Sequence, residues 1–116
     1  IPFVNENLEM KKALKILSNK KLGVLIVRNY KNITKGIITD GQIRRFNQKK
    51  KSIQLLKVKE IMTKKPFSVS KYCLAAKALT LMNSKKITSL CVYNEKNKSK
   101  TIGVVHIHNI LKNDIA

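Results

Sequence analysis

The chain has 116 residues and a formal net charge of +19, which comes from 25 Lys and Arg against 6 Asp and Glu. This length suits one compact core rather than two independent domains. No apolar run approaches the roughly 20 residues of a membrane-spanning helix, and the sequence has no signal-peptide pattern, so we expect no membrane partner. The chain begins at Ile1 instead of Met, which indicates a piece excised or processed from a longer protein.

The first half of the chain predicts alternating extended and helical segments. An extended piece at residues 1–4 is followed by apolar side chains that are spaced to form one face of a helix. These side chains are Met10, Ala13, Leu14 and Leu17. The apolar run at residues 22–27 predicts a buried strand, and a second strand begins at Gly36 after a polar loop at residues 28–35. That strand leads into a short helix that contains Ile43.

The second half repeats this order after a linker. The linker, residues 49–65, contains a short helix predicted at residues 58–62, and an extended piece follows at residues 66–69. The apolar helix face returns 65 positions later as Ala75, Ala78, Leu79 and Met82. The remaining predicted segments are a strand at residues 87–92, a polar loop at residues 93–101, a strand that begins at Gly103 and a helix that contains Ile110.

Each half therefore predicts a β-α-β-β-α repeat, and the chain predicts an α/β (α+β) fold. A unit of about 60 residues buries too little apolar surface to be stable by itself. We therefore expect the two repeats to pack about a pseudo-twofold axis as one domain. Residues 1–50 are the first repeat, whose N-terminal part is expected to be missing, and residues 51–116 are the linker and the second repeat.

Several stretches resemble a known family. Gly36–Gln42 follows the pattern G-h-h-T-x-x-D up to its last position, where h is an apolar residue, and Val58–Pro66 is similar to VxDIMTxxP. Both patterns resemble the CBS domain, and two repeats in tandem resemble a Bateman module. TDG-x-hRR at Thr39–Arg45, followed by an HxH stretch at His106–Leu111, narrows the resemblance to the C-terminal CBS pair of arabinose 5-phosphate isomerases of the KpsF/KdsD type.

The resemblance has implications for activity and partners. These isomerases interconvert ribulose 5-phosphate and arabinose 5-phosphate on the route to Kdo and lipopolysaccharide, and their chemistry lies in a preceding sugar-isomerase domain. We therefore expect no catalytic residue and no required cofactor in this chain, which would act as a regulatory module and pair as a homodimer through its CBS faces. Cys73 and Cys91 lack CxxC spacing and are expected to be reduced and buried, as in a cytoplasmic protein.

The resemblance also implies a ligand. In ligand-binding CBS repeats, the threonine and the aspartate of the motif contact the phosphate and the ribose of an adenine nucleotide in the cleft between the repeats. The matching pairs are Thr39 with Gln42 and His106 with Asn109, so an amide replaces each aspartate. Loss of this charge-assisted acceptor is expected to cost about 1.5 kcal/mol, which is a tenfold loss of affinity. The positive charge favours an anion, either an adenine nucleotide or CMP-Kdo, the product of the parent pathway.

The candidate ligand-binding residues come from these motifs and from the segments that border the base in this family. They are Pro2, Phe3, Val4, Thr39, Asp40, Gln42, Pro66, Phe67, Ser68, Ser89, Leu90, His106, His108 and Asn109. Thr39 could also serve only as the cap of a helix that begins at Asp40. His106 and His108 share a strand face and could bind a metal with Cys91, but a hydrogen-bonded or cleft-lining histidine is preferred, and we predict no metal site.

Two other functions stay open. With both aspartates lost, the sites could be degenerate and the module kept only for oligomerisation through its apolar helix faces. The charge alone favours a nucleic-acid-binding domain. However, the basic residues are 22 Lys and only 3 Arg, and arginine is the usual residue for base readout and phosphate clamping. We expect only weak, salt-sensitive and non-specific binding to nucleic acid.

Overall fold

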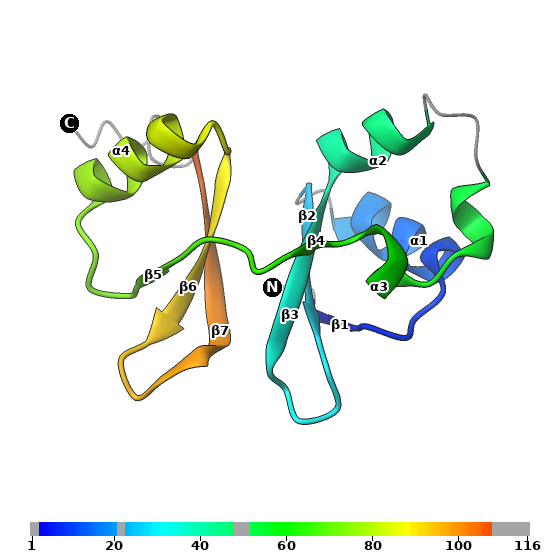
Figure 1. Ribbon diagram of the computed structural model, residues 1–116, viewed down its shortest axis with the longest axis horizontal. Coiled ribbons are helices and arrows are strands. Elements are labelled where there is room, and N and C mark those ends of the chain that lie inside the picture. The colour runs from blue at the N-terminus through cyan, green and yellow to red at the C-terminus, as the bar shows by residue number, and fades with distance from the viewer. Residues whose placement is uncertain (1–2, 21–22, 48–51, 108–116) are drawn as a thin grey trace. The chain divides into compact units, whose positions relative to one another are not determined.

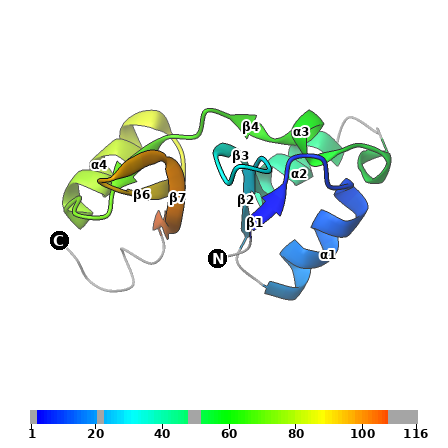
Figure 2. The same ribbon diagram turned by 90° about the horizontal axis from the view of Figure 1, so that it is seen from below.

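The computed structural model describes residues 3–20, 23–47 and 52–107 of the chain. It contains two compact units, Ile1–Lys65 and Pro66–Ala116, each with its own small sheet; the first has several helices and the described part of the second has one (Figure 1). The predicted mixed α/β fold is therefore confirmed. In the first unit the labelled helices lie on one side of the sheet, and in the second unit the one labelled helix lies to one side of its sheet (Figures 1 and 2).

The first unit contains a four-stranded sheet. Its elements are β1 (Phe3–Asn5), α1 (Met10–Lys20), β2 (Val24–Arg28), β3 (Thr34–Thr39), α2 (Asp40–Asn47), the 3-10 helix η1 (Ile53–Leu55), α3 (Val58–Ile61) and β4 (Thr63–Lys64). The strand order is β1-β2-β3-β4, with β1 parallel to β2 and the other neighbours antiparallel. The predicted order of extended piece, helix, two strands and helix is confirmed.

The core of the first unit joins the predicted helix face to the sheet. Met10, Ala13 and Leu17 are buried on α1, and they pack in one cluster with Leu25 of β2 and Ile38 of β3. Leu14 is only partly buried at the edge of this cluster. Burial of these side chains is the main favourable term for the unit, because transfer of apolar surface out of water drives folding.

The linker packs on the first unit. Val58 and Ile61 of α3 are buried in the same core. The Val58 backbone N–H donates to the Leu8 carbonyl at 2.8 Å, and β4 extends the sheet by pairing Lys64 with Gly36. The short helix predicted at residues 58–62 is confirmed, whereas η1 and β4 are elements that the sequence pattern did not predict. The first compact unit accordingly ends at Lys65.

The second unit contains a three-stranded sheet. Its elements are β5 (Ser68–Ser70), α4 (Ala75–Lys85), β6 (Ser89–Asn94) and β7 (Asn97–His106), in the order β5-β6-β7. β5 is parallel to β6, and β6 is antiparallel to β7. Ala78 and Met82 of the predicted helix face are buried against Leu90. The helix predicted around Ile110 lies outside the described residues.

One segment of the second unit differs from the prediction. Residues 93–101, expected as a polar loop, form the end of β6 and the first half of β7, with Asn94 paired to Asn97 across a tight turn. Their polar sequence misled the prediction because residues 95–100 are exposed, so this hairpin extends beyond the core. A strand pair that is exposed to solvent on both faces does not need alternating apolar and polar residues, which is the pattern that predicts strands from sequence.

Candidate functional site

The candidate residues of the first unit gather towards one end of its sheet. Thr39 ends β3 and is paired with Val24 at the start of β2. Phe3 starts β1 and is paired with Ile26, two residues further along β2. The amino ends of β1 and β2 and the carboxyl end of β3 therefore lie side by side, and the helix α2 begins there at Asp40.

Thr39 caps α2. The Gln42 backbone N–H donates to Thr39 Oγ1 at 3.2 Å, and the Asp40 N–H donates to the carbonyl of Gly23 at 3.1 Å. Gly23 has a φ of +71°, and a Cβ there would lie 3.2 Å from Asp40 Oδ2, so a glycine suits this close approach. The capping role predicted for Thr39 is confirmed, and its contact with a ligand stays a prediction.

The side chain of Gln42 is engaged within the first unit. Its Nε2 donates a hydrogen bond to the backbone carbonyl of Ile61, the last residue of α3. Its Oε1 is buried and has no hydrogen-bond partner among the described residues. A carboxylate here could not donate to a carbonyl, so the amide ties the first turn of α2 to the end of the linker helix. From the sequence this amide was expected only as a lost acceptor, and its role as a donor comes from the folded structure.

The segment predicted to border a base has two different environments. The Phe3 ring is half-buried, and the guanidinium of Arg28 lies 4.3 Å from its centroid, a cation–π contact. Val4 is buried in the core of the first unit. Pro2 lies outside the described residues.

In the second unit, candidates gather at the equivalent end of the sheet. Ser89 at the start of β6 is paired with His106 at the end of β7, so their side chains lie on the same face. Ser68 at the start of β5 is paired with Cys91, two residues along β6. Ser89 is buried and His106 is half-buried, whereas Ser68 is exposed. This polar set is the closest match to the predicted site in the second unit.

The other candidates of the second unit are dispersed. Leu90 packs in the core, Pro66 is half-buried, and the exposed Phe67 ring has the Lys85 ammonium 5.3 Å from its centroid. The Phe67 carbonyl accepts a hydrogen bond from the Cys91 backbone N–H at 3.1 Å. Two further candidates, His108 and Asn109, lie outside the described residues.

Cys91 is a poor metal ligand in this setting. Burial raises the pKa of its thiol above the ordinary value of 9.0, and a hydrogen bond with Thr101 opposes this shift. A thiol must lose its proton to bind a metal, and desolvation disfavours that step. Within the described ranges, no three His, Cys, Asp or Glu side chains gather as a metal would require.

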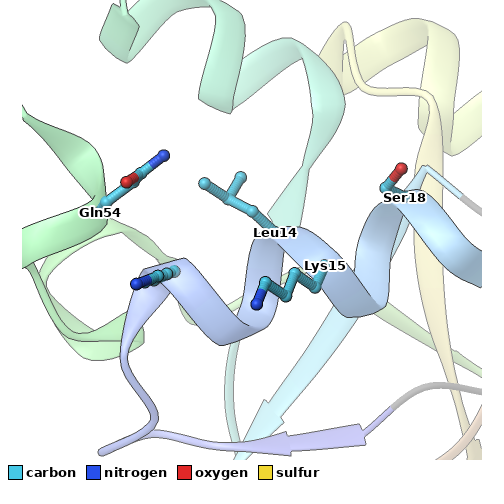
Figure 3. A pocket seen from close by; sticks show the side chains of 5 residues that line it. Leu14, Lys15, Ser18 and Gln54 are labelled. Carbon is cyan, nitrogen blue, oxygen red and sulfur yellow. The ribbon is translucent and has the colours of Figure 1, made fainter.

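Each unit has an open cavity. The first, of about 420 Å³, lies between α1 and η1 and contains no predicted ligand residue (Figure 3). It is lined by Lys11, Leu14, Lys15, Ser18 and Gln54. The second, of about 440 Å³, lies beside β5 and α4 and is lined by Ser68 together with residues that the sequence analysis did not select. The lining residues lie at positions 68–81 and 93–95, and two of them, the hydrogen-bonded Ser70 and Glu95, are 25 positions apart, so no local pattern indicates the set.

A family model places the chain among known proteins. The model of the CBS domain matches residues 1–49 and residues 58–115, which is most of the chain in two repeats. The chain belongs to the CBS domain family. As a CBS pair it is a regulatory and not a catalytic module. Among the residues of this CBS pair that the structure describes, no helix is long and apolar enough to cross a membrane.

Relatives of this CBS pair include a full-length isomerase. The chain is 33% identical over 112 residues to arabinose 5-phosphate isomerase KdsD of Yersinia pestis, and 35% identical over 111 residues to an uncharacterized protein of Rickettsia prowazekii. These matches cover 97% and 96% of this chain but only 33% of each relative. The chain thus spans about a third of the length of these relatives, and it is homologous to a part of KdsD.

Solved structures support the fold. The CBS domain protein PAE2072 from Pyrobaculum aerophilum, complexed with AMP, superposes with a TM-score of 0.83 over 97% of this chain and 88% of its own, at 15% sequence identity. At this level of identity the likeness concerns the fold alone.

Proposed function

We propose that this CBS pair is the regulatory region of an arabinose 5-phosphate isomerase in Kdo biosynthesis and that it binds an anionic nucleotide. The observation that carries the proposal is the match to KdsD, which covers 97% of this chain and 33% of KdsD. A CBS pair that forms one third of an isomerase can act on catalysis through a ligand-dependent change in its own conformation. The predicted preceding sugar-isomerase domain and cytoplasmic location belong to this proposal.

Within the described residues, we assign the ligand to the second unit. In the second unit, Ser89 and His106 form a paired polar set at the end of the sheet. A hydroxyl and an imidazole can both donate to a phosphate, and the net charge of +19 raises the local concentration of anions.

An adenine nucleotide is the first ligand to test. PAE2072 of P. aerophilum is complexed with AMP and has the same fold. CMP-Kdo is the second ligand to test, because a pathway product would give feedback on the isomerase. Its support is only the homology to KdsD.

Calorimetry on the 116-residue chain tests the proposal. AMP, ATP and CMP-Kdo are titrated separately at physiological salt. We expect saturable binding of one of them, loss of its binding near His106 in His106→Ala, and weakening in Ser89→Ala. Ser84→Ala, an exposed serine of α4, is the matched control and should bind as the unchanged protein does. Flat titrations with all three ligands at millimolar concentration would overturn the proposal.

The second candidate function is assembly without a ligand. It is favoured by the Gln42 side chain, whose amide is used as an internal tie in place of a ligand contact. In that case the chain should form a homodimer through its CBS faces. Sedimentation that detects only monomer at high protein concentration would contradict this function.

A further inference from the structure

The cavity of the second unit has a lining that none of the proposals above uses. It has a volume of about 440 Å³, within the usual range for small-molecule sites. Val69 and Leu81 contribute apolar surface, and Tyr72, Tyr93, Lys77 and Glu95 contribute aromatic and charged groups. Tyr72 follows β5, Lys77 lies on α4, and the other two lie near the end of β6 (Figure 1).

This cavity extends towards the far end of the sheet from the candidate site of the second unit. Ser89 and His106 are paired where β6 begins, whereas Tyr93 is paired with Ser70 near the end of β6. One predicted ligand residue, Ser68, lines the cavity as well. The aromatic and charged groups around Tyr93 therefore form a separate place for a ligand.

Each of the two tyrosines that line the cavity makes a cation–π contact with a lysine. The Lys71 ammonium lies 5.0 Å from the Tyr72 centroid, and the Lys98 ammonium lies 5.9 Å from the Tyr93 centroid. The Tyr72 side chain is 70% exposed, although a large aromatic ring is usually more buried. Exposed aromatic rings among cationic side chains are the groups that bind nucleobases, because each base can stack on a ring while its phosphate meets a cation.

A carboxylate completes this set. Ser70 Oγ donates a hydrogen bond to the Glu95 carboxylate and accepts one from the Tyr72 backbone N–H at 3.1 Å. Glu95 is thereby held beside Tyr72 in the lining of the cavity. A carboxylate can accept hydrogen bonds from both hydroxyls of a ribose. Gln42 and Asn109 are neutral amides and offer no charged acceptor for these hydroxyls.

We propose that this cavity binds a ribonucleotide with free 2′ and 3′ hydroxyls, either a free nucleoside 5′-phosphate or the 3′ end of a single-stranded RNA. The base stacks on Tyr72 or Tyr93, the ribose hydroxyls donate to Glu95, and the phosphate contacts the lysines, among them Lys77. This second site is independent of the ligand proposed near His106. A free nucleotide and an RNA 3′ end share the base, the two ribose hydroxyls and the phosphate that these contacts require. Their relative ability to protect the cavity distinguishes them.

The reactivity of Cys73 reports on occupancy of the cavity. Its thiol is half-buried in the lining, whereas Cys91 is buried in the second unit, so iodoacetamide should modify Cys73 selectively. We expect AMP to slow the alkylation of Cys73 and 2′,3′-dideoxy-AMP to slow it much less. An eight-nucleotide oligoadenylate RNA that protects at lower concentration than AMP would identify the RNA end as the natural source.

Variants test each contact. Tyr72→Ala should raise the AMP concentration for half-protection about tenfold, as expected for the loss of one stacked base. Tyr30→Ala is the matched control, since Tyr30 is also exposed and has the Lys31 ammonium 5.6 Å from its centroid but lies in the first unit. Glu95→Gln should reduce the preference for AMP over the dideoxy analogue.

Three outcomes would overturn the inference. The first is an alkylation rate of Cys73 that neither AMP nor the RNA changes at millimolar concentration. The second is an equal effect of Tyr72→Ala and Tyr30→Ala, and the third is equal protection by AMP and its dideoxy analogue. His106→Ala separates this inference from the proposed function, because it should remove the calorimetric site and leave the protection of Cys73 unchanged.

Discussion

Replacement of Gln42 by Glu tests whether the amide ties the linker helix to the first unit. The two side chains have the same length, but a carboxylate cannot donate to the Ile61 carbonyl that Gln42 Nε2 contacts. The variant therefore places two acceptors against each other in a half-buried position. A buried group that loses its partner costs about 1–3 kcal/mol, and we expect a loss of this size at neutral pH.

A second substitution at the same position separates the hydrogen bond from packing. Gln42→Met keeps the length of the side chain and removes both amide atoms, including the unpartnered Oε1. Its cost should be smaller than that of Gln42→Glu, because the Ile61 carbonyl loses its donor but faces no second acceptor, and the unpartnered Oε1 is removed as well. The expected order of stability is therefore unchanged protein, then Gln42→Met, then Gln42→Glu.

The loss in Gln42→Glu should depend on pH. Burial and the adjacent carbonyl would raise the folded-state pKa of the new carboxyl above its unfolded value of about 4.3. A group whose pKa is raised on folding makes its full contribution to the free energy of unfolding below its unfolded pKa. This contribution is lost as pH rises through the folded pKa. The protonated carboxyl can donate to the Ile61 carbonyl again. The difference in free energy of unfolding between the variant and the unchanged protein should therefore narrow as pH is lowered towards about 4.

Urea and thermal unfolding monitored by circular dichroism measure these effects. For a small folding unit, each kcal/mol shifts the midpoint temperature by about 4–8 °C. Gln54→Glu is the control, because Gln54 is exposed on η1 and its change should stay within about 0.5 kcal/mol. The reasoning is refuted if Gln42→Glu is as stable as the unchanged protein at pH 7, or if Gln42→Met is equally destabilised.

Other substitutions and reagents test the remaining features. Thr39→Ala should lower the free energy of unfolding by about 1 kcal/mol through loss of the α2 cap, while Thr39→Ser should keep most of it, as measured in urea. Gly36→Ala should destabilise strongly, because its Cβ would lie 2.5 Å from a backbone oxygen of the strand β4. Gly41→Ala, whose Cβ meets nothing closer than 3.5 Å on α2, should instead stabilise by about 0.5–1 kcal/mol, and thermal melts compare the two. Because burial raises the Cys91 pKa, unfolding frees this thiol to ionise, so its stabilising contribution should fall as pH rises above 9.0, which a comparison with Cys91→Ala detects.

Local patterns in the sequence predicted most of the fold. The apolar spacing on α1 and α4 predicted both helices and their buried sides, and Thr39 before Asp40 predicted the cap of α2. Such features depend on residues three or four positions apart, so the sequence displays them directly. The same reasoning failed at residues 93–101, where exposed polar strands lack the alternation that local patterns detect.

The tertiary structure alone decided how the polar groups are used. Gln42 and Ile61 are 19 positions apart, and Ser70 and Glu95 are 25 positions apart. No periodicity links such residues. They come into contact only when the strands and helices have packed, so that the chain between the two residues forms a closed loop. The sequence by itself determined two repeats and an amide in place of each aspartate. The packed units decided that Gln42 acts as a donor within the first unit and that Glu95, absent from the motifs, lies beside tyrosines and lysines in the second.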